Sequence, residues 1–303
     1  MEIRELRSLA TLAETGSLAL TGHRLNLSPA AVHRQLKVLG EEMGLALYER
    51  SGRDLILTQS ACDLLPLVHE LLAQFGSLAA AAKEMRGLEN GAIRIGSGPS
   101  FSNYLLPSLL ERFRTAYPAI EIIVDSGHSG RLTEQLRTGQ LDLVFLVSKA
   151  ASEFHVEARW KFEIVPVASP ALKVEKIRTM HELQRFPFIL YKRGTVFEEI
   201  IERYLDRQGL QPKVTMWLDN AEPIKAMLLA GFGVSLLPHW TVEEEIRTGR
   251  LVKIRCKEPP LASEVGMMRR RSAYVSPAVR AFCALAAKWR PEMRKRATRV
   301  SAS

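Results

Sequence analysis

The stretch that decides the fold of the N-terminal part lies at residues 25–39, which read LNLSPAAVHRQLKVL. Ser28 followed by Pro29 predicts a helix start, because a serine hydroxyl can cap the helix and proline suits its first position. The apolar residues that follow recur at helical spacing and predict the face that packs into a core. This core stripe contains Val32, Leu36, Leu39 and Met43.

The opposite face of the same helix carries small side chains and hydrogen-bond donors. This face contains Ala30, His33, Arg34 and Lys37. Small residues let a helix approach base edges, and Arg and Lys can reach guanine edges or phosphates. A helix expected at residues 18–25 precedes it across a short turn, and such a pair is typical of a helix-turn-helix. The alternative is a small helical bundle with a solvated basic stripe.

A β-hairpin is expected directly after these helices. Leucines bracket a turn at Ser51-Gly52, so residues 48–58 would place two arginines near a hairpin tip, which is typical of a DNA-contacting wing. Residues 1–58 hold seven basic and seven acidic side chains, so the prediction rests on where the cations lie and not on net charge. The predicted DNA contacts are Ser28, Pro29, Ala30, His33, Arg34, Lys37, Arg50 and Arg53.

Residues 59–88 are rich in Ala and Leu and predict one long helix. Its apolar residues step alternately by four and three positions, which is an unbroken heptad pattern. This period favours packing on a partner helix, most simply the same helix of a second subunit, whereas packing on its own domain is the alternative. The predicted dimer contacts are Leu64, Val68, Leu71, Phe75, Leu78 and Ala82.

The composition bounds the class of protein. A chain of 303 residues allows two or three domains, and its 47% apolar and 25% charged residues are an ordinary globular balance. The net charge of +9 comes from the C-terminal end alone, since residues 269–303 carry ten basic side chains and one acidic one. Residues 291–303 are expected to be a disordered basic tail. The overall charge therefore does not identify a nucleic-acid-binding domain.

Several other classes are excluded. Cys62, Cys256 and Cys283 are widely spaced, which argues against a disulfide framework or a zinc knuckle. The charged N-terminus is no signal peptide, and the longest uncharged stretch is too short and too interrupted for a membrane span. We therefore expect a cytoplasmic protein without membrane contact. No catalytic or metal-binding motif occurs in a suitable context, so we expect neither an enzyme nor a cofactor or metal.

From Gly91 onward, short β-rich runs alternate with helical patterns, which is typical of an α/β fold. A strand is expected at residues 93–97 and a helix at 103–117. The loop between them would present backbone N–H groups and the positive end of a helix to an anion. Ser100 and Ser102 can add hydroxyl donors, although a simple N-cap also accounts for Ser100.

Five N-terminal segments, in their order and spacing, resemble the LysR-type transcriptional regulators. They read ETGSL at 14–18, LNLSPAAV at 25–32, RQLKVL at 34–39, EEMGLALYER at 41–50 and LTQSA at 57–61. Three further segments, at 93–107, 139–144 and 227–238, extend the resemblance over about residues 1–290.

Five residues depart from the pattern of this family. Pro29 replaces the usual Gln, His33 the usual Ser and Gly40 the usual Glu, and Thr21-Gly22 replaces paired alanines. The first two lie on or beside the predicted DNA face, so the operator sequence of other members does not carry over to this chain.

The resemblance implies a chain that is α/β overall. It would comprise a winged helix-turn-helix at residues 1–58, a linker helix at 59–88 and a periplasmic-binding-protein-like (type 2) effector domain at 91–290. The last would have subdomain I at about 91–162 and 265–290, subdomain II at about 163–264, and a small-molecule cleft between them. Matching the motifs of the family predicts effector contacts at Ser100, Phe101, Ser102, His128, Ser129, Arg193, Asn220 and Phe232.

The expected function is that of a transcriptional regulator, an activator or a repressor. It would bind double-stranded DNA at a dyad-symmetric operator as a homodimer or homotetramer. A small anionic effector would control it by changing the closure of the two subdomains, and RNA polymerase would be a partner of an activator. The alternative is a solute-binding or enzyme-like α/β protein whose N-terminal domain makes protein contacts only.

Overall fold

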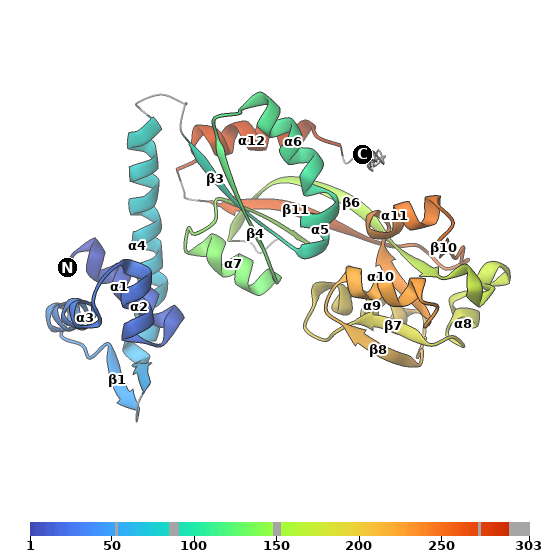
Figure 1. Cartoon of the computed structure of the whole chain (residues 1–303), viewed down its shortest axis with the longest axis horizontal. Helices are drawn as coiled ribbons and strands as arrows, with labels where there is room; N and C mark the ends of the chain where they lie inside the picture. Colours follow the sequence, from blue (N-terminus) through green and yellow to red (C-terminus); the bar gives the residue numbers. More distant parts are fainter. Residues whose placement is uncertain (52–53, 85–90, 148–152, 272–273, 291–303) are drawn as a thin grey trace, which may run out of the picture. The chain divides into compact units, whose positions relative to one another are not determined.

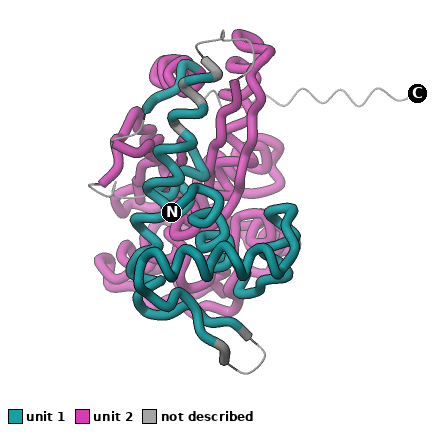
Figure 2. The backbone as a smooth tube through the Cα atoms, turned by 90° about the vertical axis from the view of Figure 1, so that its left-hand side faces the viewer, with its two compact units in different colours: residues 1–88, 134–141, 272–277 teal, residues 89–133, 142–271, 278–303 magenta. Residues whose placement is uncertain are grey.

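The structure is a computed structural model that describes residues 1–51, 54–84, 91–147, 153–271 and 274–290. The tail at 291–303 lies outside the described residues. Figure 2 shows two compact units, the first of residues 1–88, 134–141 and 272–277, and the second of residues 89–133, 142–271 and 278–303. Within the described chain, no helix is long and apolar enough to cross a membrane.

Three helices open the first unit (Figure 1): α1 (Ile3–Thr15), α2 (Leu18–Leu25) and α3 (Pro29–Met43). α1 ends where Gly16 adopts a left-handed φ of 63°, which glycine tolerates without strain. α3 begins as predicted, because the Ser28 hydroxyl accepts a hydrogen bond from the Ala31 amide. The core of the unit draws on α1 and α3 and includes Leu6, Leu9, Leu12, Val32, Leu36 and Leu39.

Two glycines of this unit stand where the chain leaves no room for a side chain. A Cβ at Gly22 would lie 2.6 Å from the carbonyl oxygen of Leu27, and a Cβ at Gly40 would lie 2.7 Å from that of Leu45. The amides of the same two leucines donate to the carbonyl oxygens of Gly22 and Gly40. The tight turns after α2 and α3 thus require glycine, which explains two departures from the pattern described above.

The predicted hairpin is formed by β1 (Tyr48–Ser51) and β2 (Asp54–Leu57), with Tyr48 paired to Leu57. Its turn at 52–53 lies outside the described residues. A single long helix, α4 (Gln59–Glu84), follows, which confirms the predicted helix up to Glu84.

One nine-stranded sheet runs through the second unit in the order β4-β3-β5-β11-β6-β9-β7-β8, with β10 paired to β6. The strands are β3 (Ala92–Ser97), β4 (Glu121–Ser126), β5 (Leu143–Val147), β6 (Phe154–Ala168), β7 (Phe188–Tyr191), β8 (Val214–Leu218), β9 (Val234–Pro238), β10 (Val252–Lys253) and β11 (Leu261–Arg270). The helices from residue 99 onward are α5 (Pro99–Tyr104), α6 (Leu106–Ala116), α7 (Ser129–Arg137), α8 (Met180–Leu183), α9 (Val196–Arg207), α10 (Ala221–Leu229), α11 (His239–Arg247) and α12 (Pro277–Lys288). The end of α7 and the first residue of α12 belong to the first unit, and the rest belongs to the second.

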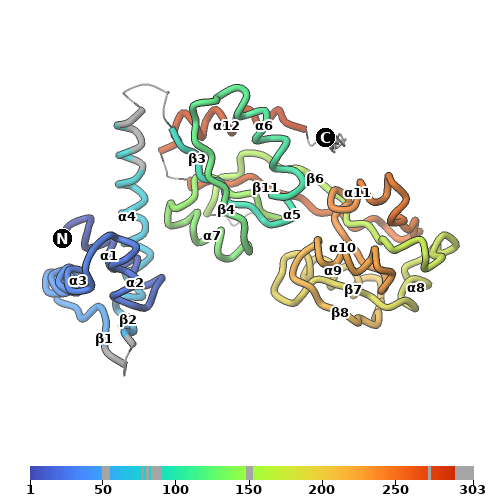
Figure 3. Tube along the Cα trace, viewed as in Figure 1, coloured from blue at the N-terminus to red at the C-terminus, as the bar shows by residue number. Residues whose placement is uncertain are grey.

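The two long strands β6 and β11 join the two ends of this sheet. β11 pairs with β5 through Val265–Met268, and β6 pairs with β9 through Ile164–Ala168. We call the end with β3, β4, β5, α5, α6, α7 and α12 subdomain I, and the end with β7–β9 and α8–α11 subdomain II. Figure 3 follows the chain into subdomain II along β6 and back along β11, so the chain crosses twice.

The helical segment after β3 differs from the prediction of one helix at 103–117. α5 begins already at Pro99, and the helix is interrupted at Leu105 before α6 begins at Leu106. Pro107 causes the interruption, because it has no N–H to donate to the preceding turn. Ser100 therefore lies in the first turn of a helix, where it is 8% exposed.

Candidate functional site

The face of α3 that was predicted to contact DNA is exposed along its length. Its exposed residues are Ser28, Pro29, Ala30, His33, Arg34 and Lys37. Arg34 makes no ion pair or hydrogen bond within the described residues. Lys37 lies 3.6 Å from Glu41, with both side chains about two-thirds exposed (65% and 64%). Such an exposed pair contributes less than about 1 kcal/mol, so Lys37 can exchange Glu41 for a phosphate.

Two contacts fix the position of α3 in its unit. The Ser8 hydroxyl of α1 donates to Gln35 Oε1 at 2.6 Å, and the His33 ring meets the Tyr48 ring of β1 edge to face at 5.9 Å between centroids. The side chain of Arg50 and all of Arg53 lie outside what the structure describes, so their DNA contacts stay a prediction.

The predicted dimer contacts on α4 divide between two faces. Val68 is buried in the core of its own unit, 3% exposed, because α4 must cover that core with one of its stripes. Leu71, Phe75 and Leu78 are 48%, 39% and 67% exposed, and Ala82 is exposed as well. Leu64 is partly buried. The exposed stripe is the part of α4 that a second subunit could cover, and Val68 does not belong to it.

A cavity of about 90 Å³ lies between the two subdomains of the second unit. Most of its walls lie at or directly after the carboxyl ends of strands, where α/β sheets commonly bind ligands. Subdomain I contributes residues 98–101, 127–129 and 145–147, and subdomain II contributes Tyr191, residues 194–197 and 219–220, and Trp240, while Val265 comes from β11.

Five of the eight predicted effector contacts line this cavity: Ser100, Phe101, His128, Ser129 and Asn220. The other three do not line it. Arg193 is exposed in the loop before α9, and Phe232 is 51% exposed. Ser102 lies on α5 with its hydroxyl buried and, within the described residues, without a partner.

The aromatic wall of the cavity is a feature that the sequence analysis missed. Phe101 stacks on Phe145 at 4.7 Å between centroids, and Tyr191 stacks on Phe197 at 5.0 Å. Trp240 completes this wall. Tyr191 is the last residue of β7 and Trp240 closely follows β9, so a search of the carboxyl end of every strand would find both.

Two hydrogen-bond donors of this wall are buried without a partner in the described structure, the Tyr191 hydroxyl and Trp240 Nε1. Burial raises the pKa of the Tyr191 hydroxyl far above its usual value, so it is a neutral donor. The neighbouring Ser100 hydroxyl lowers this pKa but less than burial raises it, and it makes no hydrogen bond of regular geometry with the Tyr191 hydroxyl. Each unsatisfied buried donor costs about 1–3 kcal/mol, which a bound acceptor would recover.

Four helices of nine or more residues begin at the cavity: α7, α9, α10 and α11. Thr195 caps α9 and Asn220 caps α10, and both capping residues line the cavity. Helix starts carry partial positive charge, so the cavity favours an anion. Among the described residues that line it there is no Lys or Arg, and His128 and Asp219 at its rim are exposed.

A wider groove of about 920 Å³ adjoins the cavity and shares Val147 and Val196 with it. Its charged lining residues are Arg159, Lys161, Arg203, Arg207, Glu199 and Glu264. Arg159 pairs with Glu264, whereas Lys161, Arg203 and Arg207 make no ion pair within the described structure. The groove therefore has a surplus of positive side chains. In the cavity, the positive potential comes from the helix starts.

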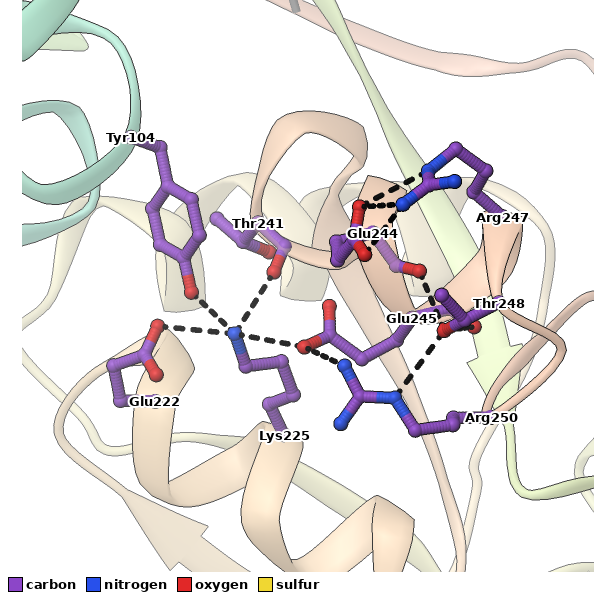
Figure 4. A network of polar contacts seen from close by, with 9 residues as sticks. All are labelled: Tyr104, Glu222, Lys225, Thr241, Glu244, Glu245, Arg247, Thr248 and Arg250. Carbon is purple, nitrogen blue, oxygen red and sulfur yellow. Dashed lines mark hydrogen bonds and ion pairs between the residues drawn. The ribbon is translucent and has the colours of Figure 1, made fainter. Parts of the chain in front are cut away.

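A polar network joins the two subdomains beside the cavity (Figure 4). Lys225 of α10 donates to the Tyr104 hydroxyl of α5 at 2.5 Å and to the Thr241 carbonyl oxygen of α11 at 3.3 Å. Its ammonium group lies 3.4 Å from a carboxylate oxygen of Glu245, whose side chain is 9% exposed and also meets Arg250 at 3.3 Å. α5, α10 and α11 each carry or adjoin a residue of the cavity wall, so this network connects the wall to the contact between subdomains.

No group of three His, Cys, Asp or Glu side chains that could hold a metal occurs in the described part of the chain.

The two candidate sites are an exposed basic helix face in the first unit and an apolar cavity with anion-favouring helix starts in the second.

The comparisons with known proteins agree on both units. Residues 3–61 match the family described as "Bacterial regulatory helix-turn-helix protein, lysR family", and residues 86–290 match "LysR substrate binding domain". The chain is 30% identical to YwqM of Bacillus subtilis, an uncharacterised HTH-type transcriptional regulator, over 84% of this chain and 88% of YwqM.

Two solved structures share the fold. A full-length OxyR variant of Pseudomonas aeruginosa matches with a TM-score of 0.74 and 19% identity, over 94% of either chain. CbnR in complex with its target DNA matches with a TM-score of 0.66 and 20% identity, over 94% of this chain and 98% of CbnR. These identities support the fold alone.

Proposed function

The chain belongs to the LysR family of transcriptional regulators, and we propose that a small anionic effector in the cavity of its second unit controls how it occupies DNA. The chain is a DNA-binding regulator with an effector-binding domain. The observation that carries the proposed DNA contact is the exposed face of α3, on which Arg34 is without a partner in the described structure.

On DNA, α3 would enter the major groove. Arg34 and Lys37 would reach guanine edges or phosphates, and His33 and Ala30 would lie close to base edges. Ser28 and Pro29, at the start of α3, would lie at the sugar-phosphate backbone of the DNA. Arg50 and Arg53 of the wing would bind the adjacent phosphates. The exposed stripe of α4 would pair two subunits, so the operator would be dyad-symmetric.

Effector control would act through the closure of the two subdomains. An effector that binds one closure state better than another shifts the population toward that state. The Lys225 network supports this route because it holds α5 of subdomain I against α10 and α11 of subdomain II. We further propose that the protein acts in the cytoplasm, has no catalytic activity of its own, and contacts RNA polymerase where it activates transcription.

The test of the DNA contact is the double variant Arg34→Ala, Lys37→Ala, compared with Arg4→Ala. Arg4 has a 65% exposed side chain, as Lys37 does, but lies on α1 and not on α3. The double variant should bind DNA much more weakly while the unfolding of the second unit, followed by its four tryptophans, stays unchanged. Full DNA affinity in the double variant, or loss of both properties together, would contradict the proposed contact.

A further inference from the structure

We infer that the effector is a small aliphatic monocarboxylate whose carboxylate accepts hydrogen bonds from Tyr191 and Trp240. The inference rests on the proposed effector control and adds the chemical class of the ligand. Three properties of the cavity carry it, namely its size, its aromatic wall and its unpartnered donors.

The size of the cavity limits the ligand to a few heavy atoms. An apolar cavity of about 150 Å³ accommodates one benzene molecule, whereas this cavity has about 90 Å³. A benzene ring would require the walls to move. In proportion to that volume, about four heavy atoms fit the cavity as it stands, which is the size of acetate.

The walls decide that most of this ligand is apolar. Phe101, Phe145 and Phe197 present rings to the cavity, and Val147 and Val265 add aliphatic surface. These side chains cannot hydrogen-bond to a hydroxylated body such as a sugar, and the polar groups of such a ligand that face them would lose water without compensation.

The donors decide that the polar end of the ligand is an acceptor. The Tyr191 hydroxyl, in a side chain that is 1% exposed, and Trp240 Nε1 are both buried without partners in the described structure. Indole N–H can only donate, and the neutral tyrosine hydroxyl can donate to any oxygen placed before it. The starts of α7, α9, α10 and α11 add positive potential, which favours an oxyanion and disfavours an ammonium group despite the aromatic wall.

The lining also limits the ligand to one negative charge. No described residue of the lining is a Lys or Arg that could pair with a second carboxylate, and Asp219 at the rim adds a negative charge of its own. Dicarboxylates and phosphates would find cations in the adjoining groove, at Lys161, Arg203 and Arg207. The cavity would therefore bind monoanions and the groove dianions.

The test titrates the full chain with sodium acetate, propionate and isobutyrate, with sodium chloride at equal ionic strength as the reference, and follows tryptophan fluorescence. At least one of the three should bind saturably. Propionamide, propylammonium and malonate should each bind at least about tenfold more weakly, because each lacks the single charge or adds one that the cavity cannot hold. Stronger binding of benzoate, malonate or propylammonium would overturn the inference.

Tyr191→Phe removes the donor and keeps the ring, so the fold should persist. We expect it to weaken the binding of the preferred monocarboxylate about tenfold or more, the loss of one hydrogen bond to a charged acceptor. Arg203→Gln in the groove is the matched control and should leave this binding unchanged. Unchanged affinity in Tyr191→Phe, or lost affinity in Arg203→Gln, would place the anion elsewhere and overturn the inference.

A DNA titration with and without the bound monocarboxylate separates this inference from the proposed function. Saturable, Tyr191-dependent binding that leaves DNA affinity and footprint unchanged would support the ligand class and contradict effector control. Absence of binding by all three monocarboxylates, with Arg34-dependent DNA binding intact, would overturn the ligand class and leave the DNA contact standing.

Discussion

Lys225→Met is the substitution that tests most sharply how the two subdomains are held together. It keeps the length and most of the volume of the side chain but removes an ammonium group whose side chain is only 12% exposed. The Tyr104 hydroxyl and the Thr241 carbonyl oxygen lose their partner, and Glu245 keeps only Arg250.

The expected cost follows from burial. Removing one partner of a buried ion pair costs about 3–5 kcal/mol when the other charge is left alone. Because Arg250 still compensates Glu245, we expect Lys225→Met to lower the free energy of unfolding by about 2–3 kcal/mol. Glu222→Gln is the matched control, since Glu222 also contacts Lys225 but is 48% exposed, and it should cost less than about 1 kcal/mol.

The assay is urea unfolding of the full chain followed by tryptophan fluorescence, because all four tryptophans lie in the second unit. A double-mutant cycle with Tyr104→Phe should give a coupling of about 1–2 kcal/mol between the two subdomains. A cost for Lys225→Met no larger than that of Glu222→Gln, or additive effects of Lys225→Met and Tyr104→Phe, would refute the role of this network.

Three further predictions concern other parts of the chain. Gly233→Ala should destabilise the second unit by about 2–3 kcal/mol, because the new Cβ would lie 2.2 Å from the Pro187 carbonyl oxygen. Gly130→Ala is the control in the same unfolding assay and should be neutral or stabilising, because a Cβ at this position of α7 meets no atom within 4 Å. Leu71→Glu with Phe75→Glu should give monomers in sedimentation velocity, and an unchanged dimer would contradict the α4 interface. Iodoacetamide at pH 8 should alkylate the exposed Cys62 well before the other two cysteines. Burial raises the pKa of Cys256 to about 11 and that of Cys283 to about 12, so their reactive thiolate forms become abundant only as the pH rises toward those values. Equal alkylation rates of the three cysteines by mass spectrometry would contradict this.

The local signals in the sequence predicted much of the first unit. The Ser28-Pro29 start, the faces of α3 and the hairpin all depend on neighbours within a few residues, and the structure places them as expected. The need for Gly22 and Gly40 could not be predicted in this way, because it comes from the approach of a turn that follows each helix.

The lining of the cavity could be predicted from the sequence only in part. Residues beside recognisable motifs, such as Ser100 and His128, line the cavity, but Arg193 in the loop before α9 does not. The aromatic wall assembles side chains from both subdomains, including Phe145 and Trp240, which no periodicity connects. Val68 likewise follows the heptad of its neighbours, yet the winged domain buries it.

The salt dependence of DNA binding tests the central claim most directly. Promoter fragments recovered by genomic footprinting are titrated with the chain at several salt concentrations. If Arg34, Lys37, Arg50 and Arg53 of two subunits contact phosphates, the slope of log K against log salt should be roughly −7. Arg34→Ala with Lys37→Ala should reduce it to roughly −4, since four of eight contacts are lost. A slope near zero, or an unchanged slope in the double variant, would contradict DNA recognition by this winged helix-turn-helix.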